Sequence, residues 1–243
     1  MEYEIKVLDI NVKDIRKKLL AVGCKKLHNA IMFKRNVFYL CDKATDGFAR
    51  VRDEGTNVTM TTKVYIDKDF PQETEVSINE DFTKASTFME SLGLDKKSLQ
   101  ESIREKYSHP LAHEITIDSV PGIPTYMEID CTNKKNLDKL IKLLNVDKNN
   151  IRTGSFDKQY TEYYGITKEE FTKTKSITFK NIKNEIKPKK NTELFDKIIS
   201  QYTEKYLKSV EKSVKSKTIK NNVKNTIKRT CKKCKKGTRK RCV

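Results

Sequence analysis

The sequence predicts an α+β fold of about eight short, mainly antiparallel strands and a few helices, followed by a lysine-rich C-terminal extension. Three observations support this prediction. Several segments alternate between apolar and charged side chains, which is the pattern of strands with one buried face. Turn-forming residues separate these segments. Charge is distributed unevenly along the 243 residues, which divides the chain into two parts of different character.

The division of charge lies near residue 166. Residues 1–165 contain 26 Lys+Arg and 26 Asp+Glu, whereas residues 166–243 contain 25 basic and 7 acidic residues. The whole formal charge of +18 therefore lies in the C-terminal part. Such an asymmetry is typical of a basic arm that binds nucleic acid or another polyanion. We expect a body over residues 1–166 and a basic extension over residues 167–243.

The first strand shows the charge pattern that recurs along the body. Its apolar residues share one face, and the opposite face carries Glu2, Glu4 and Lys6. Carboxylates two residues apart on a strand lie roughly 7 Å from each other. This spacing suits oxygen ligands of one hard cation, with an ammonium group beside them to hold a phosphate. An ordinary strand with a solvated face shows the same pattern, so the weight of the argument rests on its repetition.

The remaining elements of the body follow from periodicity and end signals. Asn11 caps a predicted helix that Gly23 ends, and Gly93 ends a second helix over residues 83–92. Amphipathic spacing predicts a third helix over residues 134–144, and an aromatic segment over residues 155–164 ends the body. The predicted strands after the first cover residues 30–40, 48–53, 58–65, 72–78, 99–109, 112–119 and 125–131.

Acidic pairs and basic residues are segregated on these strands. The basic positions are Arg50-x-Arg52, Lys63 and Arg104, and the acidic ones are Glu73-x-Glu75, Asp118 and Glu128-x-Asp130. Like charges side by side on one strand face repel each other. Their segregation is explained if they converge on metal ions and a polyanion. The residues alone leave open whether the sheet is open or closes into a barrel with the charges inside.

This ordered set of motifs resembles the CYTH group of triphosphate tunnel metalloenzymes, over roughly residues 1–166. The group includes class IV adenylate cyclases, thiamine triphosphatases and inorganic triphosphatases, with fungal-type RNA triphosphatases as distant relatives. The resemblance implies an eight-stranded antiparallel β-barrel with a polar interior and flanking helices. A charged interior is costly unless its charges are paired or bind ions, so ligand and metal should stabilise the protein.

The resemblance also implies roles for individual residues. The triphosphate-binding bases would be Lys6, Arg50, Arg52, Lys63 and Arg104. The ligands of Mg²⁺ or Mn²⁺ would be Glu2, Glu4, Glu128 and Asp130, with Glu73, Glu75 and Asp118 as further candidates. Lys6, Glu2 and Glu4 would form the catalytic set, with Lys6 handling a proton. These residue types suit the chemistry, because arginine matches phosphate bidentately and magnesium prefers oxygen ligands.

Three positions depart from the family pattern. Gln72 and Ser102 stand where relatives often carry a base, and the last acidic pair ends in Asp130. The aspartate keeps a carboxylate, but the other two changes remove positive charge from the expected cradle. They leave the substrate and the strength of its binding open.

The predicted function is a divalent-metal-dependent phosphohydrolase acting on inorganic, nucleoside or thiamine triphosphate. One alternative is a class IV-type adenylate cyclase, which converts ATP to cyclic AMP and pyrophosphate. A second is an RNA 5′-triphosphatase, which the basic extension favours. A third is a non-catalytic tunnel that binds polyphosphate or nucleic acid.

The extension predicts a basic linker over residues 167–190, a helix over about residues 192–214 and a disordered polycation beyond it. The helix has an apolar stripe that requires a packing partner. No apolar run of about 18 residues occurs, so no membrane partner is expected. The charged N-terminus and unpaired cysteines indicate an intracellular, chiefly cytoplasmic protein, and the Lys/Arg-rich end raises a nuclear alternative. The oligomeric state stays open.

Overall fold

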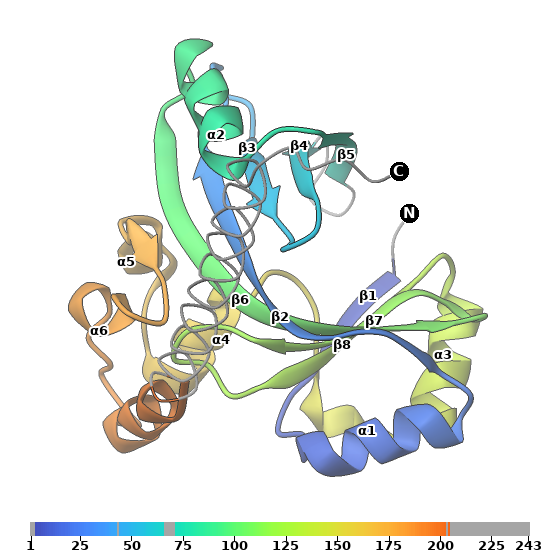
Figure 1. The fold of residues 1–243 in the computed structure, drawn as a ribbon. Helices are drawn as coiled ribbons and strands as arrows, with labels where there is room; N and C mark the ends of the chain where they lie inside the picture. The colour runs from blue at the N-terminus through green and yellow to red at the C-terminus, as the bar shows by residue number, and fades with distance from the viewer. Residues whose placement is uncertain (1–2, 43, 66–70, 203, 205–243) are drawn as a thin grey trace, which may run out of the picture. The chain divides into compact units, whose positions relative to one another are not determined.

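The structure is a computed structural model that describes residues 3–42, 44–65, 71–202 and 204. The chain divides into two units, Met1–Ile199 and Ser200–Val243. In its described part, the first unit holds one large, mainly antiparallel sheet with helices against its outer face and at one end (Figure 1). The predicted α+β class is confirmed. No helix in the described ranges has the length and apolar character that crossing a membrane requires.

Among the residues that the structure describes, eight principal strands build the sheet, in the order along the chain that the sequence predicts. They are β1 (Tyr3–Val7), β2 (Lys25–Phe38), β3 (Gly47–Asp53), β4 (Val58–Tyr65), β5 (Pro71–Ile78), β6 (Lys96–His109), β7 (Ala112–Ser119) and β8 (Tyr126–Cys131). Antiparallel neighbours follow the order β5-β4-β3-β2-β6-β7-β8-β1. The short strand β9 (Ile151–Arg152) extends this path by pairing with β1. A second short strand, β10 (Ser176–Ile177), lies off the path and pairs in parallel with β6.

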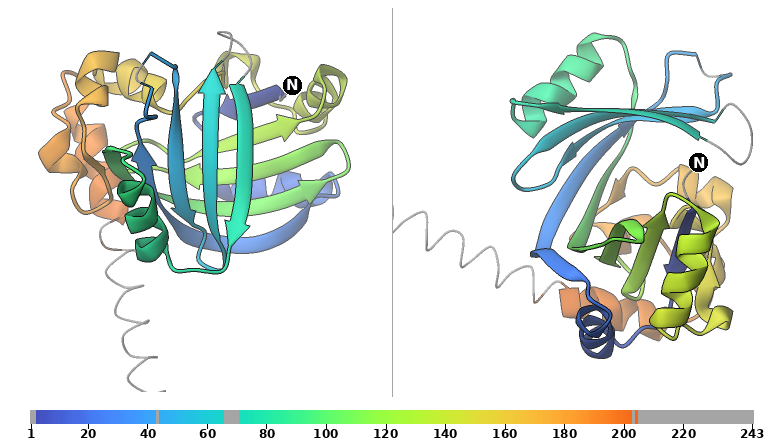
Figure 2. Two further views of the ribbon diagram at one scale, coloured as in Figure 1. Left: turned by 90° about the horizontal axis from the view of Figure 1, so that it is seen from above. Right: turned by 90° about the vertical axis from the view of Figure 1, so that its right-hand side faces the viewer.

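The sheet curls strongly, so that β3, β4 and β5 arch over β1, β7 and β8 (Figure 2). The long strands β2 and β6 form the bend, and register shifts interrupt their pairing at several points. Such irregularities increase local bending and twist of a strand pair. Within the described residues, β5 pairs with β4 alone and β1 pairs with β8 and β9, so the curled sheet stays open along one side. We call its concave surface the inner face.

Helices cover the apolar outer face. Helix α1 (Val12–Ala21) and helix α3 (Lys134–Leu143) pack on β1 and β6–β8 over a buried cluster that includes Leu19, Ile115, Ile129 and Leu140. Helix α2 (Phe82–Ser91) packs on β3 over Ala49 and Val51. Because side chains alternate between the two faces of a strand, burying these apolar residues turns the charged ones inward.

The C-terminal segment differs from the predicted linker. Helix α4 (Asp157–Tyr164) leads into helix α5 (Lys168–Thr172), β10, helix α6 (Ile182–Glu185) and helical residues 192–202, while a 3₁₀ turn, η1 (Lys148–Asn150), precedes β9. Residues 167–199 belong to the first unit rather than to a separate extension. Their apolar side chains join a buried cluster that contains Tyr160, Tyr164, Ile177, Ile182 and Phe195. The first unit therefore ends at Ile199 rather than at the predicted residue 166, because this segment completes a core.

Strand β6 also holds this segment through polar contacts. Leu99 N donates to Lys175 O at 2.9 Å, and Phe179 N donates to the Glu101 carboxylate at 3.1 Å. The predicted helix therefore packs against the first unit at the start of its apolar stripe, where Phe195, Ile198 and Ile199 are buried. The predicted continuation of this helix to residue 214, and the predicted polycation beyond it, lie outside the described residues.

Candidate active site

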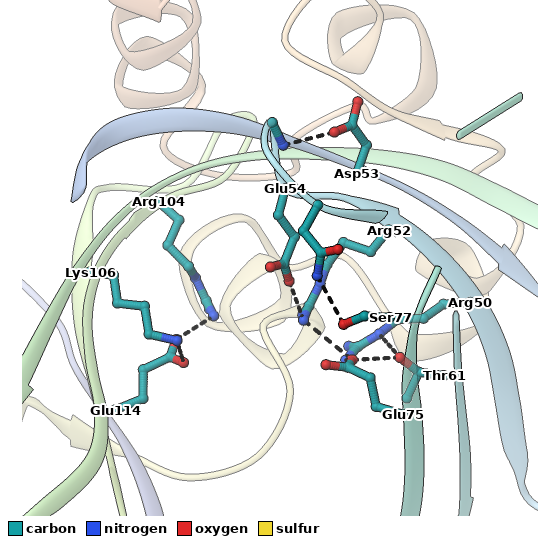
Figure 3. A network of polar contacts seen from close by, with 12 residues as sticks. Arg50, Arg52, Asp53, Glu54, Thr61, Glu75, Ser77, Arg104, Lys106 and Glu114 are labelled. Atoms are coloured by element: carbon teal, nitrogen blue, oxygen red, sulfur yellow. Dashed lines mark hydrogen bonds and ion pairs between the residues drawn. The ribbon is translucent and has the colours of Figure 1, made fainter. Parts of the chain in front are cut away.

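Two groups of charged side chains line the inner face. The β3–β5 cluster consists of Arg50, Arg52, Glu54, Lys63, Glu73 and Glu75. The β1–β8 cluster consists of Glu4, Lys6, Arg104, Lys106, Glu114, Asp118, Glu128 and Asp130, from strands β1, β6, β7 and β8. Side chains from both clusters point into the space between the two halves of the sheet (Figure 3).

Strand register assembles the β3–β5 cluster. The antiparallel pairing places Lys63 opposite Glu73, and the two form an ion pair at 3.0 Å. Arg50 Nη2 donates at 3.1 Å both to Glu73 and to Glu75. Arg52 Nη2 lies 3.3 Å from Glu75. The middle Glu-x-Glu pair therefore neutralises the basic residues of β3 and β4 in the free protein.

Arg104 is the centre of the β1–β8 cluster. It donates from Nε and Nη2 to the two oxygens of Asp118 at 2.8 and 2.7 Å, and from Nη1 to Glu114 at 2.9 Å. Burial would lower the pKa of Arg104, but Asp118 and Glu128 outweigh it and raise that pKa. Asp118 is 1% exposed, and burial raises its pKa although Arg104 opposes the shift. The contacts thus leave Arg104 charged and tightly oriented.

Lys6 lies between two carboxylates. Its Nζ is 3.0 Å from Glu128 and also contacts Glu4. Burial would lower the pKa of Lys6, but the charges of Glu128 and Glu4 outweigh burial and raise it. Lys6 is therefore held as a cation, which suits charge stabilisation better than proton abstraction. Burial, followed by the charge of Glu128, raises the pKa of Glu4.

The candidate metal ligands on β1 and β8 are neighbours in the sheet. Glu4 lies opposite Asp130, and Lys6 lies opposite Glu128. Carboxylate oxygens on adjacent strands are the donors that Mg²⁺ and Mn²⁺ prefer, so the donor chemistry fits. In the part of the chain with described coordinates, no three His, Cys, Asp or Glu side chains already lie close enough together to hold an ion. Glu2 lies outside the described residues.

The two clusters act on each other electrostatically. The positive charge of Lys63 on β4 opposes the rise in the pKa of Glu4 on β1. The positive charge of Arg104 on β6 adds to the lowering of the pKa of Arg52 on β3. For both groups burial is the largest influence. Residues that are far apart in the sequence thus belong to one electrostatic site.

The structure adds residues that sequence reasoning missed. Glu54 pairs with Arg52, and Glu114 pairs with Arg104 and Lys106. Arg35 of β2 lies opposite Arg52, with its guanidinium 5.4 Å from the ring centre of Phe156. Burial, with the charges of Arg50 and Arg104, lowers the pKa of Arg35 to about 10. The sequence signal that could have identified Arg35 was strand alternation, which places it on the same face of β2 as Phe33, two residues earlier.

The two departures from the family pattern differ in their consequences. Gln72 directly precedes Glu73 on β5, so strand alternation places the side chains of these two residues on opposite faces. Gln72 therefore removes no charge from the inner face, contrary to the expectation. Ser102 is buried on β6 opposite Phe33, two residues from Arg104, and shares the inner face with it.

A family model described as the CYTH domain matches residues 1–155. No match was found among the curated proteins. The PH1012 protein of Pyrococcus horikoshii OT3 has a similar structure, with 18% identity, a TM-score of 0.55 and coverage of 65% of this chain and 99% of its own. The PH1819 protein of the same organism is also similar, with 24% identity, a TM-score of 0.51 and coverage of 67% of this chain and 99% of its own.

A third similar structure is that of a Vibrio parahaemolyticus protein named as a candidate adenylate cyclase. It shares 12% identity at a TM-score of 0.54, with 66% of this chain and 97% of that chain covered. At these identities the structures establish the fold alone. The family model covers more than half of the chain and contains every strand of both charged clusters. The chain therefore belongs to the CYTH domain family.

Proposed function

We propose that this protein is a divalent-metal-dependent phosphohydrolase that acts on inorganic, nucleoside or thiamine triphosphate. The observation that carries the proposal is the joint placement of bases and carboxylates on one concave face. The bases are Lys6, Arg50, Arg52, Lys63 and Arg104, and the carboxylates beside Lys6 are Glu4, Glu128 and Asp130. Membership of the CYTH family supports it.

The bases suit a polyphosphate because they are many, close together and partly accessible. Arg50, Arg52 and Lys63 keep 12%, 16% and 20% of their side-chain surface exposed. In the free protein their charges are balanced by Glu73 and Glu75. A bound triphosphate would compete for the same guanidinium groups, and an arginine fork matches phosphate oxygens bidentately.

A Mg²⁺ or Mn²⁺ ion held by Glu2, Glu4, Glu128 and Asp130 would neutralise charge that develops on the phosphate chain. In this proposal Arg104, oriented by Asp118, and Lys6, held by Glu128, fix the phosphates against these carboxylates. Arg50 and Arg52 hold the phosphates from the opposite half of the sheet. The main contribution of the chain is then positioning and charge stabilisation rather than covalent chemistry.

The test is a product assay on the full-length protein. Triphosphate, ATP and triphosphate-ended RNA would each be incubated with magnesium and with manganese. A Glu4→Gln plus Glu128→Gln double variant serves as the inactive form, and Glu80→Gln on the surface serves as its control. Phosphate release by the wild type and by Glu80→Gln, with loss in the double variant, is expected. No phosphate from any substrate would rule out the hydrolase.

The second candidate is an adenylate cyclase. The similar Vibrio parahaemolyticus structure, whose protein is named as a candidate for that activity, favours its inclusion. The same bases would hold ATP, with its ribose 3′-hydroxyl placed to attack the α-phosphorus. Pyrophosphate and cyclic AMP in the same assay would then replace free phosphate.

A further inference from the structure

Arg35 and Arg52 lie directly opposite each other on the neighbouring strands β2 and β3. Side chains in such a position have Cβ atoms about 5 Å apart, and like charges there destabilise a sheet. Arg50 and Arg104 also act on Arg35 as neighbouring positive charges. The inner face thus gathers positive charge at one point, and this cost requires an explanation.

Carboxylates neutralise the other three arginines but not Arg35. Arg50 pairs with Glu73 and Glu75, Arg52 pairs with Glu54 and Glu75, and Arg104 pairs with Asp118, Glu114 and Glu128. For Arg35, the contacts found among the described residues include the ring of Phe156 but no ion pair or side-chain hydrogen bond. An unpaired, half-buried charge is costly in the free protein.

Arg52 provides a second and independent observation. Its Nε is buried and has no hydrogen-bond partner in the described part of the chain. A buried donor without an acceptor costs free energy, and a guanidinium carries five such donors. The unsatisfied donor of Arg52 and the unpaired charge of Arg35 come from residues that face each other. On the other side of Arg35, the opposite residue of β6 is the uncharged Gln100.

We propose that Arg35 and Arg52 form an anion subsite that binds one phosphate group of the substrate. This inference rests on the proposed function and names a further binding residue for it. An anion between the two arginines would satisfy their donors and remove their mutual repulsion.

Phe156 positions Arg35 in this subsite. Its ring lies under the guanidinium and is itself held by Phe171, 5.9 Å away, and Tyr160, 6.3 Å away. Phe156 directly follows the last residue that the family model matches. Phe156, held by Phe171 of the C-terminal segment, thus contributes a contact to the inner face.

The test measures binding separately from turnover. Inorganic triphosphate is titrated into the full-length protein in EDTA by calorimetry, and melting temperatures are recorded without ligand. Arg35→Gln should weaken binding about ten- to a hundredfold, because a charged hydrogen-bonding group is lost. The same variant should melt at a higher temperature than the wild type, because it removes an unpaired, half-buried charge. Arg35→Lys should retain part of the affinity.

Two further variants sharpen the test. Lys84→Gln removes one positive charge from the exposed face of α2 and should bind triphosphate like the wild type. Phe156→Ala should weaken binding in the wild-type background but have little further effect in Arg35→Gln, since coupled residues are non-additive. Additive effects of the two substitutions would overturn the positioning role of Phe156.

The outcomes separate this inference from the proposed function. Unchanged triphosphate affinity in Arg35→Gln would overturn the subsite, as would reduced affinity together with a lower melting temperature, which indicates a structural role. A wild type that binds triphosphate through Arg35 but releases no phosphate would sustain the subsite and overturn the hydrolase. A wild type that binds no triphosphate in EDTA would overturn the subsite, while the hydrolase is decided separately by phosphate release in the presence of magnesium or manganese.

Discussion

Arg104 on β6 holds both carboxylate oxygens of Asp118 on β7, which lies directly opposite it in the sheet. Thr116 also donates to Asp118, at 2.9 Å. The resemblance to the CYTH group implied that Asp118 is a further candidate metal ligand. Since its oxygens are engaged by Arg104 and Thr116, we propose instead that Asp118 orients Arg104 toward the substrate.

Asp118→Asn should therefore impair the reaction without changing the side-chain shape. Arg104 would keep Glu114 but lose its forked partner, and supporting residues of this kind typically cost about ten- to a hundredfold in activity. We expect a fall of that size in kcat/KM for triphosphate, measured by phosphate release. Asp138→Asn, on the exposed face of α3, is the matched control. Wild-type kinetics in Asp118→Asn would remove the orienting role.

Metal binding should depend on Glu4 and Glu128. Each single change to glutamine removes one negative charge and one strong oxygen ligand, so affinity for Mn²⁺ should fall at least about tenfold. Calorimetric titration of Mn²⁺ into the full-length protein measures this directly, and EDTA should abolish phosphate release by the wild type. Equal Mn²⁺ affinity in the wild type and both variants would place the metal elsewhere.

Acid stability should depend on Glu105, which anchors α1 to the outer face of β6. Burial would raise its pKa, but hydrogen bonds from Arg16, Tyr107 and Lys26 outweigh burial and lower it to about 2. The pKa in the unfolded chain is about 4.3, so the group stabilises the folded state above that pH. This contribution, roughly 3 kcal/mol, is lost as pH falls from about 4.3 toward about 2.

Glu105→Gln should accordingly lower the free energy of unfolding near neutral pH by roughly 2–3 kcal/mol and flatten its dependence on acid. Urea denaturation across the acidic range measures both effects. Glu80→Gln removes an exposed carboxylate that pairs with Lys84 and should change little. A pH dependence in Glu105→Gln as steep as in the wild type would contradict the assignment.

Two truncations should separate the C-terminal segment from the residues beyond it. Ending the chain after Ile166 removes Ile177, Ile182 and Phe195 from a buried cluster, and the protein should fail to fold. Ending it after Tyr202 retains that cluster and should leave the melting temperature nearly unchanged. Thermal unfolding of both forms checks this, and a stable protein ending at Ile166 would refute the structural role of the segment.

The truncation after Tyr202 also addresses the RNA alternative. It removes much of the basic sequence that could attract a polyanion. If RNA is the substrate, phosphate release from triphosphate-ended RNA should fall while release from inorganic triphosphate stays constant. Parallel activities on both substrates would argue against an RNA role for this region.

Local pattern was enough to predict most of the strands and their faces. Val58–Tyr65 and Ala112–Ser119 form as predicted, because a period of two and turn residues at each end are properties of adjacent residues. The same alternation indicated that Arg50 and Arg52 share a face. The order of the charged motifs was enough to suggest the family. Ends such as the first residues of β2 were predicted less well, because pairing with β6 extends that strand.

The sequence by itself thus determined which residues alternate, which faces are charged and which family the motifs resemble. Only the tertiary structure decided which charges meet. Arg50 reaches Glu73 and Glu75, Arg104 reaches Asp118, and Arg35 faces Arg52 through strand register. The tertiary structure also decided that residues 167–199 belong to the first unit. The physical reason is that periodicity acts between adjacent residues, whereas register, curvature and burial arise from contacts between distant segments.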